Sequence, residues 1–179
     1  AGTAKTDSAS CRLKALNPAV EITTATERLT PDNALALLEK CDLAVDASDN
    51  YAARFALADA CAALRIPLVH GAVKGFIGQA TVFAPHEGTA CYRCLFPEET
   101  PMQEEDTASA AGILGAHAGI IGCIQALEAL KALAGIPSPL RGGLLSADTL
   151  RMRFTVIPLH PSPTCKCRNG GGGGAAMKN

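Results

Sequence analysis

The sequence predicts an α/β protein with a parallel sheet and helices on both faces. Segments typical of strands and of helices alternate along most of the chain, which is the pattern of a sheet covered by helices. The 179 residues are 48% hydrophobic and only 18% charged, which is enough apolar material for one domain with a sizeable core. We expect that domain to span residues 1–168. A flexible tail over residues 169–179, which contains five consecutive glycines, should follow it.

The first part of the chain is expected to form two helices and a strand. A helix over Lys5–Leu16 should end before the helix stop Asn17-Pro18. Residues 20–26 alternate apolar and polar side chains, which is typical of a strand. Thr30 and the following proline provide a capping hydroxyl and a first-turn proline for a second helix, which should run to about Lys40.

The middle of the chain continues the alternation. A short apolar strand over residues 43–45 ends in the polar residues 46–50, and an alanine-rich helix over Tyr51–Leu64 follows. A long helix should cover residues 111–133 and end at a glycine and a proline. The other expected strands lie over residues 66–70, 76–83, 143–147 and 152–158.

Charge and composition exclude some classes of function. Lys and Arg total 16 against 17 Asp and Glu, with no basic block, so a large nucleic-acid surface is not expected. The longest uncharged run, residues 107–127, carries four glycines and few long aliphatic side chains, so we interpret it as a buried helix and expect no membrane span. No leader sequence opens the chain, and we expect a cytoplasmic protein.

Two closely spaced pairs of cysteines suggest a metal site. Cys91 and Cys94 form a C-x-x-C turn, and Cys165 and Cys167 lie more than seventy residues later. Four thiolates are what a tetrahedral structural zinc needs. The alternatives are unrelated free thiols or a redox couple, but a redox C-x-x-C usually opens a helix, and Leu-Phe-Pro follows this one. The remaining cysteines are expected to be small buried hydrophobes, as is His117 in its apolar helix: Cys11, Cys41, Cys61 and Cys123.

A polar loop after the first short strand is the candidate for catalysis. Asp46 and Asp49 follow that strand, and Arg54 lies one helical turn beyond Asn50. In open α/β sheets, ligands bind at the carboxyl ends of strands, where an aspartate can hold Mg²⁺ against phosphates and an arginine can pair with phosphate. An equally plausible alternative is that Asp49 or Ser48 only caps the next helix.

Several motifs in the same order resemble the ThiF/MoeB/HesA family, the bacterial relatives of ubiquitin-activating enzymes. They lie at residues 46–54, 91–97, 111–115 and 119–131. The resemblance implies a Rossmann-like doubly wound sheet, present in part, and an ATP- and Mg²⁺-dependent adenylyltransferase. Such enzymes activate the C-terminal glycine of a ubiquitin-like sulfur carrier in molybdopterin or thiamine synthesis, and they form homodimers.

The same resemblance assigns roles to individual residues. It implies that Asp49 and Arg54 are catalytic, that Lys5 and Asn50 bind the nucleotide together with Asp49, and that the four paired cysteines hold structural zinc. By spacing alone, Lys5 would be an ordinary surface residue.

The sequence also departs from the family pattern. The family's glycine loop, ribose-binding acid and phosphate-binding arginine all precede the lysine, so we expect them to lie before residue 1 or on another chain. Ala108 stands where the family often has a cysteine, and one residue instead of two separates the second cysteine pair. Two alternatives remain: a zinc-stabilised carrier-binding or dimerisation module, and a nicotinamide-dependent oxidoreductase that lacks its glycine fingerprint.

Overall fold

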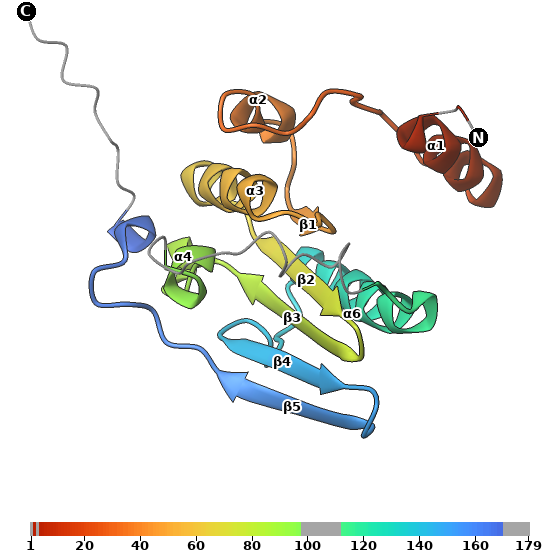
Figure 1. The fold of residues 1–179 in the computed structure, drawn as a ribbon. Helices are drawn as coiled ribbons and strands as arrows, with labels where there is room; N and C mark the ends of the chain where they lie inside the picture. Colours follow the sequence, from red (N-terminus) through yellow and green to blue (C-terminus); the bar gives the residue numbers. More distant parts are fainter. Residues whose placement is uncertain (1, 3, 98–111, 170–179) are drawn as a thin grey trace, which may run out of the picture.

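A computed structural model describes residues 2, 4–97 and 112–169 (Figure 1). The centre is a five-stranded sheet in the order β1-β2-β3-β4-β5. The strands are β1 (Ala44–Asp46), β2 (Leu68–Lys74), β3 (Ile77–Phe83), β4 (Gly143–Asp148) and β5 (Arg153–Pro158). The helices are α1 (Lys5–Leu16), α2 (Ala34–Leu38), α3 (Tyr51–Leu64), α4 (Tyr92–Leu95) and α6 (Gly115–Leu133), with short 3-10 turns η1 (Pro85–Glu87) and η3 (Lys166–Asn169).

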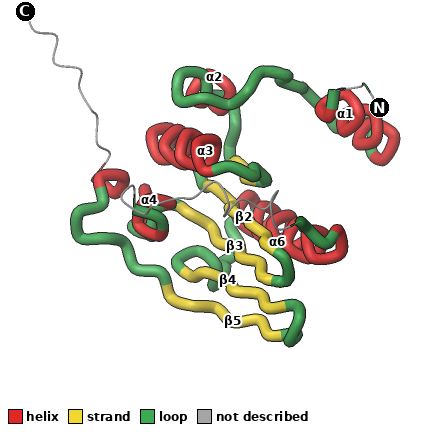
Figure 2. The backbone as a smooth tube through the Cα atoms, in the orientation of Figure 1, coloured by secondary structure: helices red, strands yellow, loops and turns green. Residues whose placement is uncertain are grey.

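Helices cover both faces of the sheet, which confirms the predicted α/β class (Figure 2). On one face, Leu57 and Cys61 of α3 and Tyr92 of α4 pack with Leu68 and Phe83 of the sheet. On the other face, α6 packs against β2 and β3. The side chains of α6 that face the sheet recur every three or four residues: His117, Ile121, Gln125 and Glu128. The prediction that His117 belongs to the core is confirmed, since it is 2% exposed.

The expectation of a parallel sheet is wrong for most strand pairs. Only β1 and β2 pair in parallel, and the other three pairs are antiparallel. The reason lies in the connections, because a parallel pair needs a crossover whereas a tight turn reverses the chain. Gly75 and Phe76 join β2 to β3, with Gly75 at a φ of 57°. Residues 149–152 join β4 to β5 in the same way.

Local signals set the ends of α3. The side-chain oxygen of Asn50 accepts a hydrogen bond from the backbone of Ala53 at 2.9 Å, which caps the start. Arg65 ends the helix in the left-handed region with a φ of 57°, and the next amide donates to the carbonyl of Cys61. The predicted helices over Lys5–Leu16 and Tyr51–Leu64 are therefore confirmed to the residue.

Other boundaries differ from the prediction. Residues 20–26 lie in an extended but mostly exposed loop rather than a strand, because they have no strand partner among the described residues. The helix expected from Thr30 to Lys40 is reduced to α2, and the backbone of Thr30 instead donates to the side chain of Asn33 in a turn. The long helix begins at Gly115 rather than residue 111, since Ile113 makes an isolated bridge with Gly75.

Candidate active site and thiol cluster

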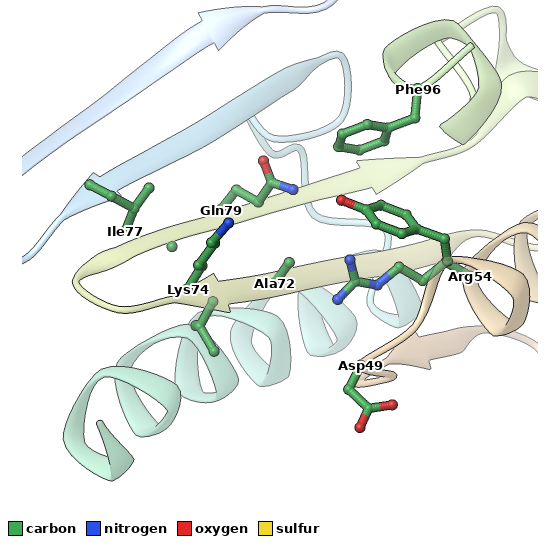
Figure 3. A pocket seen from close by; sticks show the side chains of 10 residues that line it. Asp49, Arg54, Ala72, Lys74, Ile77, Gln79 and Phe96 are labelled. Atoms are coloured by element: carbon green, nitrogen blue, oxygen red, sulfur yellow. The ribbon is translucent and has the colours of Figure 1, made fainter. Parts of the chain in front are cut away.

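The candidate active site lies where β1 ends and α3 begins. Two adjoining cavities, each of about 190 Å³, share Asp49, Arg54, Ala72 and Val73 in their walls. Figure 3 shows the first of them, with Arg54 reaching across toward Ala72 and with Gln79 and Phe96 on the far side. The predicted residues Asp49 and Arg54 thus both line these cavities at the carboxyl end of a strand, although the carboxylate of Asp49 points away from the guanidinium of Arg54 (Figure 3).

The structure decides which residue caps α3. Asn50 occupies the cap position, whereas Asp49 and Ser48 do not. The amide nitrogen of Asn50 lies 3.3 Å from a carboxylate oxygen of Asp49. The side chain of Asp49 is exposed at the cavity and is not used to start the helix. The alternative in which Asp49 or Ser48 serves only as a cap is therefore wrong.

A buried aspartate holds this loop in place through hydrogen bonds. Asp46 is 1% exposed, and one carboxylate oxygen accepts hydrogen bonds from the backbone of Ser48 at 2.9 Å and from its hydroxyl at 2.6 Å. The other oxygen lies 2.7 Å from Nδ1 of His70, its neighbour across the β1–β2 pair. Although burial raises the pKa of Asp46, the hydrogen bonds with His70 and Ser48 lower it below its usual value overall. Asp46 is therefore an ionised group in the core.

Arg54 is held by the same loop. Its terminal nitrogen donates to the carbonyl of Ser48 at 2.8 Å, and its Nε lies 4.0 Å from Asp46. The guanidinium also lies 5.5 Å from the ring centre of Tyr51. The side chain of Arg54 is only 11% exposed, and these contacts restrict the positions that its guanidinium can take at the cavity wall.

The structure does not bring Lys5 to this site. Lys5 is exposed at the start of α1, a helix without a buried residue that lies apart from the sheet in Figure 1. Lys74 and Gln79, from the β2–β3 hairpin, line the cavity instead. Sequence reasoning missed both, although the two-residue periodicity of strands places every second residue of such a hairpin on one face.

Sequence reasoning also missed Gln125, which approaches from the opposite face of the sheet. Its amide nitrogen donates to the carbonyl of Asp46 at 2.7 Å and to that of Val69 at 3.3 Å. Gly71 permits this approach, because a Cβ there would lie 2.6 to 2.7 Å from the amide oxygen and nitrogen of Gln125. The end of β1 is therefore held from both faces.

Three of the four paired cysteines converge. The Sγ of Cys91 lies 3.6 Å from that of Cys94 and 3.5 Å from that of Cys165. Four sulfurs around a zinc at ~2.3 Å would be about 3.8 Å apart, so these spacings suit a tetrahedral ion. The backbone of Ser162 donates to Cys94 at 3.3 Å. Cys167 hydrogen-bonds with Cys91 but does not belong to the mutually close group.

The pKa values of these thiols bear on the alternative of a redox couple. The hydrogen bond with Cys167 and burial both raise the pKa of Cys91, and burial raises that of Cys165 to about 11. The bond from Cys91 lowers the pKa of Cys167. Cys91 does cap the short helix α4, contrary to expectation, but a redox cysteine needs a lowered pKa rather than a raised one. The geometry therefore favours metal binding over a redox couple.

The other cysteines are mostly not buried. Only Cys61 lies in the core, where burial raises its pKa to about 12. Cys11, Cys41 and Cys123 are exposed, so the expectation for these three is wrong. Each lies on the open side of its helix or at a helix end, where no sheet covers it.

Comparison with known proteins identifies the family. The sequence profile of the ThiF family matches residues 1–169. The chain belongs to the ThiF family. Among curated relatives of this ThiF-family chain, the adenylyltransferase and sulfurtransferase MOCS3-2 of Zea mays is 42% identical over 165 residues, which are 92% of the chain and 34% of the relative.

Two further relatives come from prokaryotes. The SAMP-activating enzyme E1 of Haloferax volcanii is 41% identical over 171 residues, 95% of the chain and 63% of the relative. The sulfur carrier protein adenylyltransferase of Thermus thermophilus is 42% identical over 160 residues, 86% of the chain and 58% of the relative. The ThiF-family chain thus spans between one third and two thirds of the length of these relatives.

Solved structures agree on the fold. Escherichia coli MccB crystallised with ATP superposes with a TM-score of 0.74 at 14% identity, over 92% of this chain and 51% of that one.

Ala108 and the glycine tail lie outside the described residues. Within the described part of the ThiF-family chain, none of the helices is long and apolar enough to cross a membrane.

Proposed function

We propose that this chain contributes Asp49 and Arg54 to the site at which a ubiquitin-like sulfur carrier is adenylated. The observation that carries the proposal is the cavity at the end of β1, where an exposed aspartate not needed as a cap lies beside a held arginine. Two relatives support it: the sulfur carrier protein adenylyltransferase of Thermus thermophilus and the SAMP-activating enzyme E1 of Haloferax volcanii. Sulfur carriers of molybdopterin or thiamine synthesis are the proposed substrates.

The proposed reaction joins the carrier to AMP. An oxygen of the carrier's C-terminal carboxylate attacks the α-phosphorus of ATP. The bond from that phosphorus to the bridging oxygen breaks, and pyrophosphate leaves with the electron pair. Magnesium, when bound, would offset the phosphate charge. Asp49 offers the hard carboxylate oxygens that Mg²⁺ prefers, with Asn50 holding its orientation. Arg54 supplies donors toward phosphate. Lys5 lies apart from the cavity in this structure, so its proposed role as a further phosphate ligand requires α1 to approach the site.

The test is carrier-dependent exchange of pyrophosphate into ATP, with the protein expressed from its whole reading frame. Asp49→Asn should lower the exchange rate by ~10²-fold or more, because the variant removes a negative charge whose interaction stabilises chiefly the transition state. Asp42→Asn is the matched control, since Asp42 is an exposed carboxylate just before β1. Near-normal exchange by Asp49→Asn would overturn the catalytic role. Carrier binding with no exchange in the unmodified protein would favour the alternative, a carrier-binding or dimerisation module.

We further propose that no covalent carrier intermediate forms through Ala108, since a methyl group cannot act as a nucleophile. Incubation with carrier and MgATP should therefore give no reductant-sensitive adduct. The same incubation of Ala108→Cys is the informative comparison. An adduct mapped to Cys123 in the unmodified protein would contradict this proposal.

We also propose that Cys91, Cys94, Cys165 and Cys167 hold one structural zinc. The converging sulfurs support it, because a divalent cation bound among them would displace their protons and be held by the resulting thiolates. Such an ion would join α4 to the C-terminal segment, which lies 74 residues away in sequence.

A further inference from the structure

We propose that His70 and Asp46 form a buried positioning pair that fixes the Ser48 carbonyl and, through it, the guanidinium of Arg54. The inference rests on the proposed adenylation site for its catalytic consequence, but its structural part is tested separately below. Both residues lie outside the cavity wall, since neither lines it. They act through Ser48 and Arg54, which do line the cavities.

A continuous series of hydrogen bonds connects the core to Arg54. Nδ1 of His70 lies 2.7 Å from one oxygen of Asp46. The other oxygen accepts from the amide and hydroxyl of Ser48 at 2.9 and 2.6 Å. The carbonyl of Ser48 then accepts from Arg54 at 2.8 Å. The tautomer of His70 with its proton on Nδ1 donates to Asp46, which agrees with the lowered pKa of that carboxyl.

The buried surroundings of His70 indicate that its ring interacts with one polar group, the carboxylate of Asp46. His70 is 0% exposed and packs against the rings of Phe83 and Tyr92, whose centroids lie 5.9 and 5.3 Å from that of His70. Its other nitrogen, Nε2, is buried and has no hydrogen-bond partner among the described residues. Asp46 is therefore the only polar partner of the ring there. A buried polar group left half unsatisfied calls for a reason beyond packing, and an apolar side chain would fill this space without that cost.

The position of Asp46 gives that reason. It is the last residue of β1, and its carboxylate folds the following loop back on itself through Ser48. Gln125 holds the carbonyl of the same residue from the other face of the sheet. The loop that carries Asp49 therefore starts from a rigid point, and the long side chain of Arg54 is tied to that loop rather than left to solvent. Groups held in this way keep reacting atoms aligned.

Three variants separate positioning from simple stability. His70→Leu fills the space but removes the donor to Asp46. His70→Asn retains a donor, because its side-chain nitrogen branches from Cγ as Nδ1 does. Leu68→Ala is the matched control. Leu68 lies on β2, as His70 does, and packs in the core cluster that contains Phe83 and Tyr92, but its side chain has no polar group.

The first readout needs neither ATP nor a carrier. Phenylglyoxal modifies arginines, and peptide mapping gives the rate at Arg54 relative to exposed Arg153. We expect that rate to rise several-fold in His70→Leu and to stay near the unmodified protein's in His70→Asn and Leu68→Ala. Should His70→Leu fail to fold, Ser48→Ala removes only the hydroxyl bond to Asp46 and should still raise the rate. An unchanged rate in a folded His70→Leu, or in Ser48→Ala, overturns the proposal.

The second readout is carrier-dependent pyrophosphate exchange. Misplacement by about 1 Å costs on the order of 10²-fold in rate, so kcat should fall 10- to 100-fold in His70→Leu with little change in KM for ATP. His70→Asn should restore most of it, and Leu68→Ala should keep it at temperatures where the variant is folded. If the Arg54 labelling behaves as expected but the unmodified protein shows no exchange, the positioning pair stands and the proposed adenylation fails. If exchange depends on Asp49 but His70→Leu keeps full kcat, the positioning role fails and the adenylation stands.

Discussion

Replacing Gly71 with alanine should destabilise the protein through its effect on a side chain on another element. The added carbon would lie 2.6 and 2.7 Å from the amide oxygen and nitrogen of Gln125, roughly 1 Å inside the ~3.5 Å of ordinary contact. Gln125 must then move. That movement breaks its hydrogen bonds to the carbonyls of Asp46 and Val69.

The magnitude follows from two contributions. Overpacking of a core typically costs about 1–3 kcal/mol, and leaving a buried polar group unpaired costs about 1–3 kcal/mol more. We therefore expect Gly71→Ala to lower the free energy of unfolding by about 2–5 kcal/mol. For a chain of this size, each kcal/mol corresponds to about 2–4 °C in Tm. Urea denaturation followed by circular dichroism measures the loss.

Two further variants make the test specific. Ala72→Ser adds an atom to the neighbouring residue, which faces the cavity, and should stay within about 0.5 kcal/mol of the unmodified protein (Figure 3). Gln125→Ala makes room for the alanine at position 71, so the double variant should lose less stability than the sum of the two single variants. Additive losses, or a Gly71→Ala protein as stable as the original, would refute the reasoning.

Three more expectations concern metal, pH and assembly. Metal analysis should return about one zinc per chain, and this zinc should be lost when Cys91 and Cys94 are both changed to Ser. Chelation should lower Tm, because metal binding contributes to folding. A folded protein that contains no zinc would contradict this expectation. The pKa of Asp46 is lower in the folded protein than the value of about 3.9 in the unfolded chain, so its ionised form adds stability at pH values above about 3.9. This stability is lost as the pH falls through the pKa of the folded protein. Urea midpoints should therefore drop on acidification below about pH 4, and should drop less in Asp46→Asn. Gly115, Gly119 and Gly122 of α6 have open space beside them, which would let the helix of a second copy approach closely. Light scattering at micromolar concentration should therefore show a homodimer, whereas a strict monomer would count against it.

The amount that sequence reasoning recovered depended on how local the signal was. Helices α1 and α3 were predicted to the residue because their stop and cap residues lie next to them, as Asn50 and Arg65 do for α3. The strand direction was missed because alternation of strand and helix says nothing about the two-residue turn at Gly75 that makes β3 antiparallel to β2. The predicted strand over residues 20–26 failed because alternation needs a neighbouring strand to pair with.

The candidate site divides in the same way. The sequence by itself determined the family, the α/β class, and the proximity of Asp49 to Arg54, since only four residues and a helix start separate them. It also determined the C-x-x-C turn at Cys91. These are short-range features, which the spacing of residues along the chain already constrains.

Only the tertiary structure decided which distant groups meet. It placed Cys165 against Cys91 across 74 residues, His70 against Asp46 across 24, and Gln125 against the carbonyl of Asp46 across 79. It also assigned the cap of α3 to Asn50, which left Asp49 exposed at the cavity. Spacing along the chain could not show these contacts, because they arise from the register of β1 on β2 and from the approach of α6 over Gly71. Both are consequences of packing between elements, where many side chains must fit at once.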